Sequence, residues 1–87
     1  MVSKYILAKF TDMEFKKTKE KYTDKLYWCA GVINRVQTMQ DIFWLIYPHG
    51  AGFNLFRKVG FGGKAEKICH VQKFDIAKAI ANLMQNG

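Results

Sequence analysis

The side chains best suited to chemistry in this chain are cations and aromatic rings. Residues 1–28 hold seven lysines against four carboxylates, and residues 53–73 hold five cations against the carboxylate of Glu66. Phe61 lies among the glycines of the second segment. Lysine and arginine neutralise phosphates, and aromatic rings stack on unpaired bases. The pattern therefore predicts a surface that binds a polyanion, with RNA or single-stranded nucleic acid as the ligand class.

Both cationic segments would have to lie on one face of the molecule to form such a surface. Phe61 would stack on a base, and Phe56 or Phe53 would extend the stacking surface. The alternative hypothesis is that these phenylalanines belong to the core and that the lysines are only solvated. The candidate nucleic-acid-binding residues are Lys16, Lys17, Lys19, Lys21, Arg57, Lys58, Phe61, Lys64 and Lys67.

The glycine-rich segment contains no named phosphate-binding loop. Gly63 and Lys64 match the end of a P-loop, but Lys58 stands at the position of its first glycine and Ala65 replaces the magnesium-binding hydroxyl. A KH-type G-x-x-G, here Gly60 to Gly63, would have to join helices. The glycines are therefore expected to form a hairpin turn, where a positive φ is needed.

Neither a metal site nor a cofactor is expected. The two cysteines and two histidines, Cys29, His49, Cys69 and His70, lack the paired spacing of metal ligands. His49 could act as an exposed general base, as in metal-free ribonucleases, but loop histidines without a catalytic role are far commoner. We therefore expect no catalytic residue and no enzymatic activity.

The first elements that would position the cations are a strand over residues 4–10 and a helix over residues 12–22. The helix is predicted by a capping box, T-x-x-E, formed by Thr11 and Glu14. The lysines of this segment would cover its outer surface. The side chains expected toward the core are Met13, Phe15, Thr18 and Tyr22.

Two further segments are expected to be strands. Residues 25–36 are compatible with a helix, but Gly31 and several β-branched residues favour a long strand with a bulge. Residues 42–47 are apolar at consecutive positions, which predicts a central strand covered on both faces and ended by Pro48.

The last part of the chain predicts a hairpin and a helix. Residues 53–59 and 64–71 would be strands joined by the glycine turn, and the final segment would be an amphipathic helix with Asp75 as its N-cap. Residues 1–87 would form a single basic α+β domain, a small antiparallel sheet of four to five strands with two helices packed on one face. The apolar stripe of the final helix is expected to be Ile76, Ala77, Ile80, Leu83 and Met84.

The net charge of +7 favours a polyanionic partner. An alternative hypothesis is a protein-binding inhibitor that docks its basic face on an acidic host protein without nucleic acid. An exposed sheet edge would allow a homo-oligomer. No apolar run is long enough to span a membrane, and two cysteines do not make a disulfide framework, so a reducing, cytoplasmic compartment is expected.

In composition the chain resembles the small accessory proteins of large lytic phages. It is short, rich in Lys, Phe, Tyr and Ile, has a single Pro and opens with MVSKYILAKF. That class includes antagonists of host defence, among them RNA-binding inhibitors of toxin endoribonucleases. The resemblance implies a phage protein that acts in the host cytoplasm as a toxin inhibitor, and it transfers no functional position.

Overall fold

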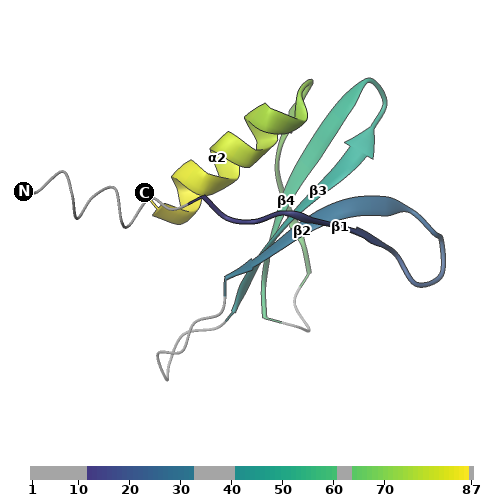
Figure 1. Cartoon of the computed structure of the whole chain (residues 1–87), viewed down its shortest axis with the longest axis horizontal. Helices are drawn as coiled ribbons and strands as arrows, with labels where there is room; N and C mark the ends of the chain where they lie inside the picture. The colour runs from purple at the N-terminus through teal and green to yellow at the C-terminus, as the bar shows by residue number, and fades with distance from the viewer. Residues whose placement is uncertain (1–11, 33–40, 61–63, 87) are drawn as a thin grey trace, which may run out of the picture.

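The computed structural model describes residues 12–32, 41–60 and 64–86. In these residues a single antiparallel sheet has the strand order β1-β2-β3-β4-β5, and a C-terminal helix, α2, lies across one face (Figure 1). Each strand thus pairs with its neighbour in sequence. The elements are β1 (Lys16–Lys19), β2 (Leu26–Val32), β3 (Ile42–His49), β4 (Gly52–Val59), β5 (Glu66–Val71) and α2 (Phe74–Asn86).

The core lies between α2 and the centre of the sheet. Trp44 and Ile46 on β3 and Leu55 on β4 are at most 1% exposed. They pack against Ala77 and Ala81, whose small side chains allow the helix to approach the sheet closely. Burying large apolar side chains in this way supplies most of the stabilisation available to a small domain.

Polar and aromatic contacts fix the position of α2 on the sheet. Nε1 of Trp44 donates a hydrogen bond of 2.9 Å to Oε1 of Gln85 near the end of the helix. At its start, the ring of Phe74 lies 4.8 Å from the ring of Trp28 and 5.7 Å from that of Phe53. The two ends of the helix are therefore held to different strands.

The predicted helix over residues 12–22 is wrong. Lys16–Lys19 pair with β2 as an edge strand, and the amide of Glu20 donates a 2.8 Å hydrogen bond to the carbonyl of Lys25 across the following turn. Met13 and Phe15 do pack against the core, whereas Tyr22, at the turn, is 89% exposed. Pairing with β2 outweighs the local helix preference of this segment. Thr11 and the strand expected over residues 4–10 lie outside the described residues.

The other elements are close to expectation. Residues 26–32 form a strand rather than a helix, but the strand pairs with β3 in regular register, without the expected bulge. Residues 33–36 of this predicted strand lie outside the described residues. Pro48 lies within β3 instead of ending it. The prediction that residues 42–47 are covered on both faces is wrong, because α2 covers one face and is the only helix in the described part of the chain. On the other face of β3, the side chains of Phe43, Leu45 and Tyr47 are half-buried.

The apolar side of α2 is wider than its contact with the sheet. Ala77 is fully buried and Ile80 packs against the core, as expected. Ile76, Leu83 and Met84 are 45%, 68% and 46% exposed, which contradicts the expected core stripe at these three positions. The buried contacts come instead from the positions that face the sheet directly. Asp75 is not the N-cap, since the helix begins one residue earlier; it lies in the first turn, where a carboxylate interacts favourably with the helix dipole.

Gly52 and Gly50 are glycines for different reasons. Gly50 has a φ of 59° in the two-residue turn between β3 and β4, as a type II′ turn requires at its first position. Gly52 lies so close to β5 that an added Cβ would overlap the carbonyl oxygen of Val71 and lie 2.9 Å from Nε2 of His70.

We expect Gly52→Ala to lower the free energy of unfolding by about 1–3 kcal/mol, because β4 and β5 must separate to admit the methyl group. Urea denaturation followed by tryptophan fluorescence measures the change. Gly50→Asn is the comparison for backbone strain alone, since nothing lies within 4 Å of a Cβ at that position and asparagine is among the side chains that best tolerate a positive φ. Equal stability of Gly52→Ala and the parent protein would contradict this close approach.

Candidate nucleic-acid interface

The sheet face opposite α2, called here the open face, gathers side chains of two kinds. Successive residues of a strand point to opposite faces, so the residues paired directly across the strands share a face. The residues paired with the buried core positions define the helix face, and the alternate ones define the open face. The described residues of the open face include Lys16, Thr18, Tyr27, Cys29, Phe43, Leu45, Tyr47, His49, Asn54, Phe56, Lys58, Lys67 and His70.

One row of the open face crosses all five strands. Lys16 on β1 pairs with Cys29, which pairs with Leu45, then Phe56 and finally Lys67 on β5. The three central side chains are half-buried and apolar, and the lysines at the two ends are exposed. Strands lie about 4.8 Å apart, so the two lysines stand about 19 Å apart at the backbone. The row therefore has a positive charge at each edge and an apolar centre.

A β-bulge places Lys67 in this row. Leu55 pairs with Cys69, but the next residue, Phe56, pairs with Lys67, so Ile68 is the extra residue of β5. Ile68 packs against the core cluster. The register shift thereby turns Lys67 to the open face.

A neighbouring row carries stacked aromatic rings. The rings of Tyr27 and Tyr47 lie 4.7 Å apart at an angle of 8°, and the ring of Phe56 meets Tyr47 edge-on at 5.6 Å. Farther along this row, Nδ1 of His70 lies 2.6 Å from Oδ1 of Asn54. Phe43 adds a fourth aromatic ring on the same face, opposite Lys58.

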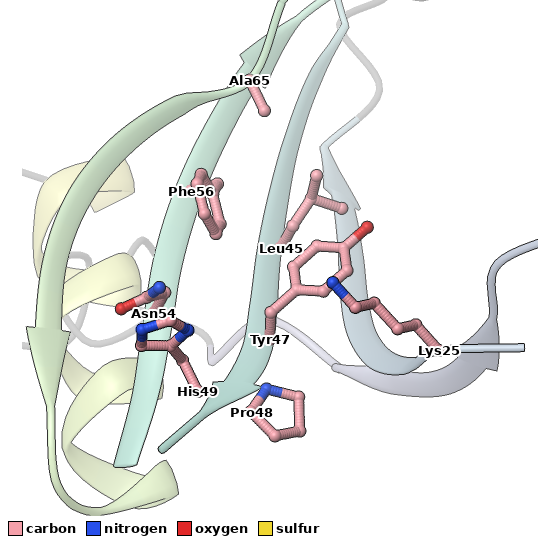
Figure 2. Close-up of a pocket in the computed structure, with 8 residues that line it drawn as sticks. All are labelled: Lys25, Leu45, Tyr47, Pro48, His49, Asn54, Phe56 and Ala65. Atoms are coloured by element: carbon pink, nitrogen blue, oxygen red, sulfur yellow. The ribbon is translucent and has the colours of Figure 1, made fainter. Parts of the chain in front are cut away.

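The open face is hollowed on both sides of Tyr47. One hollow of about 400 Å³ is lined by side chains that include Leu45, Tyr47 and Phe56 (Figure 2). A second, of about 320 Å³, is lined by Tyr27, Cys29, Phe43, Leu45, Tyr47 and Lys58. Because both hollows share Leu45 and Tyr47, they form neighbouring compartments of one surface.

The centre of the open face is uncharged at neutral pH. Burial raises the pKa of Tyr47, and the nearby Glu20 carboxylate, which accepts a hydrogen bond from the phenol, raises it further. Burial also raises the pKa of the Cys29 thiol, an effect that the positive charge of Lys58 partly offsets. Hydrogen bonds from Thr23 and then Tyr47 lower the pKa of Glu20, so one carboxylate stands at the corner of this face near the β1–β2 turn.

Within the described ranges no helix is long and apolar enough to cross a membrane. Nor does that part of the chain gather three His, Cys, Asp or Glu residues that could hold a metal ion. No family model, no curated protein and no solved structure matches this chain.

The structure brings only some of the predicted site residues together. Lys16, Lys58 and Lys67 lie on the open face. The neighbouring positions in the strands point to the helix face, where Nζ of Lys17 and Cζ of Arg57 lie 6.0 Å from the rings of Trp28 and Trp44. The predicted cationic residues therefore do not form one surface but are divided between the two faces of the sheet. Of the other candidates, Lys19 lies on the helix face, Lys21 lies in the β1–β2 turn, Lys64 precedes β5, and Phe61 lies outside the described residues.

The aromatic candidates also divide between the faces. Phe53 packs against Trp28 and Phe74, so the core alternative is confirmed for this residue, whereas Phe56 lies on the open face. Tyr27, Phe43 and Tyr47 also lie on the open face, although the sequence did not single them out as site residues. The signal for Phe43, Leu45 and Tyr47 was their spacing of two residues in the strand over residues 42–47.

Proposed function

We propose that the protein is a non-catalytic binder of RNA or another single-stranded nucleic acid, which lies across the open face of the sheet. The observation that carries the proposal is the cross-strand row with Lys16 at one edge, Lys67 at the other and Phe56 near its centre. We place this binding in the cytoplasm, the compartment expected from the two unpaired cysteines.

The chemistry of the open face suits a single-stranded nucleic acid better than a duplex. Unpaired bases expose faces that stack on aromatic rings, which contributes about 1–3 kcal/mol per base. Tyr27, Tyr47 and Phe56 offer such rings. The lysines at the edges neutralise the phosphates on either side of the stacked bases. A duplex keeps its bases paired and stacked internally, so it would use only the lysines.

Binding to a protein partner is the second candidate function. It is favoured by Ile76, Leu83 and Met84, which together expose an apolar side of α2. Lys17 and Arg57 on the helix face would favour an acidic partner.

Fluorescence anisotropy with a labelled single-stranded RNA and the matching duplex tests the proposed function. Each phosphate contact contributes about 0.7 to the log–log salt dependence for single strands. With about four to six contacts, raising salt from about 50 to about 200 mM should weaken binding about 50–300-fold. Affinity that hardly changes with salt, or equal affinity for the duplex at every salt concentration, would contradict the proposal.

The two cysteines can show which face of the sheet the RNA covers. Cys29 lies on the open face and Cys69 packs into the core on the helix face. We expect saturating single-stranded RNA to slow maleimide labelling of Cys29 and to leave the labelling rate of Cys69 unchanged, as measured by mass spectrometry. Protection of Cys69 alone would place the ligand on the other face.

A further inference from the structure

The larger hollow of the open face has apolar walls and a polar end. Leu45, Tyr47 and Phe56 form its walls, and His49 and Asn54 lie side by side at its end (Figure 2). Figure 2 also shows the Lys25 amine reaching toward Tyr47 at the rim. Its volume of about 400 Å³ lies within the range of small-molecule sites.

Asn54 presents hydrogen-bond donors at this polar end. The residue is only 8% exposed, and its Oδ1 lies 2.6 Å from Nδ1 of His70. Because Oδ1 can only accept, Nδ1 of His70 carries the hydrogen and the Nδ2 donors of Asn54 are not used in this contact. Nδ2 has no partner among the described contacts, and Asn54 lines the hollow, which leaves these donors for a ligand bound there.

His49 forms the other side of the polar end. It is exposed, and its ring stands 5.9 Å from that of His70 at an angle of 84°. A histidine ring offers either a donor or an acceptor at each nitrogen, depending on its tautomer. The site thus combines the amide donors of Asn54 with the ring of His49, whose nitrogens can donate or accept a hydrogen bond.

We propose that this hollow is a subsite for one unpaired base that carries a ring carbonyl, with uracil as the simplest example. The base packs against Tyr47 and Phe56, its carbonyl oxygen accepts a hydrogen bond from Nδ2 of Asn54, and Lys25 interacts with the attached phosphate. Adenine has no exocyclic carbonyl and is disfavoured. The inference rests on the proposed function, and it adds a base preference to a surface that otherwise stacks on any base.

Charge and continuity favour a nucleotide as the occupant. Lys25 at the rim complements a phosphate, whereas the walls are apolar. The hollow shares Leu45 and Tyr47 with the second compartment, which is flanked by Lys58. A strand can therefore place one base in the subsite and the next beside Tyr27 without leaving the open face.

NMR titration of the ¹⁵N-labelled protein with uridine 5′-monophosphate, adenosine 5′-monophosphate and ribose 5-phosphate tests the subsite. One hydrogen bond is worth about 0.5–1.5 kcal/mol, so we expect uridine monophosphate to bind about 3–10-fold tighter than adenosine monophosphate. It should shift the side-chain amide signals of Asn54, and ribose 5-phosphate should not. Equal affinities with unmoved Asn54 signals would overturn the subsite.

Asn54→Asp is the sharpest variant, because it keeps an acceptor for His70 and removes the two donors. It should abolish the preference for uracil, while Thr18→Asp, the same charge change elsewhere on the open face, should retain it. A uracil preference that survives Asn54→Asp would overturn the subsite while salt-dependent RNA binding still supported the proposed function. Failure of the parent protein to bind any single-stranded RNA would instead reject the proposed function itself.

Discussion

Charge reversal at Lys16 and Lys58 together should weaken binding of single-stranded RNA by about 100–1000-fold at low salt. Each substitution to Glu removes an attraction to phosphate and adds a repulsion, each worth about 1 kcal/mol at contact distance in water. Both lysines lie on the open face, at different strands of the sheet. Fluorescence anisotropy at constant ionic strength measures the loss, and the log–log salt dependence should become shallower as well.

The matched control for this pair is Lys17→Glu with Lys19→Glu. These lysines belong to the same edge strand as Lys16, and their side chains point to the helix face. The control protein has the same net charge as the first variant, so any difference in affinity reports the face and not the total charge. An equal loss in both variants would contradict the assignment of the ligand to the open face.

Replacing Trp44 with Ala should lower the free energy of unfolding by about 3–5 kcal/mol, the usual cost of removing a buried aromatic side chain. Trp44 is 1% exposed, contacts the helix alanines and donates a hydrogen bond to Gln85. A chain of 87 residues has a total stability of about 4–13 kcal/mol, so much of it would be lost. Urea denaturation followed by circular dichroism measures the change.

Phe43→Ala, at the neighbouring position, should have a small effect on stability and a large effect on RNA binding. Phe43 is half-buried on the open face, so we expect a stability loss of about 1 kcal/mol and a clear loss of RNA affinity, because stacking on an aromatic ring is worth about 1–3 kcal/mol per base. Greater destabilisation by Phe43→Ala than by Trp44→Ala would contradict the assignment of Trp44 to the core and of Phe43 to the open face.

The second half of the fold could be predicted from local patterns. The apolar run of residues 42–47 and the amphipathic pattern after Lys73 each correspond to an observed element, whereas residues 61–63 of the predicted glycine turn lie outside the described residues. The two confirmed signals depend on residues close together in sequence. Little tertiary information was therefore needed to predict this strand and this helix.

The prediction of a helix over residues 12–22 was wrong because its evidence was local, whereas the interaction that decides the structure, pairing with β2, is between residues distant in sequence. The capping box and four lysines between residues 16 and 21 are typical of a solvated helix. The same lysines are equally compatible with an edge strand, where charged residues on both faces discourage pairing with other chains. Pairing of Lys16 with Cys29 makes this segment a strand, and no periodicity within residues 12–22 indicates that pairing.

The open face could be predicted only in part. The spacing of Phe43, Leu45 and Tyr47 indicates that these three share a face, but it does not say whether another element covers them. Placing Lys16 and Lys67 at the two ends of one row requires the register of all five strands, including an extra residue in β5. Register is a property of strand pairs and is absent from the pattern of any one strand.

The bulge at Ile68 makes the charge of each face depend on strand register as well as on composition. It places Glu66 opposite Arg57 and turns Lys67 the other way. If the same strand paired regularly, with Ile68 opposite Phe56, Lys67 would point beneath the helix and Glu66 outward. Loss of Ile68 itself would preserve the present orientations, because Lys67 would then follow Cys69 in regular alternation. The attraction of this edge for anions therefore depends on one irregularity in strand pairing, and a change of register alone would make the edge repel them.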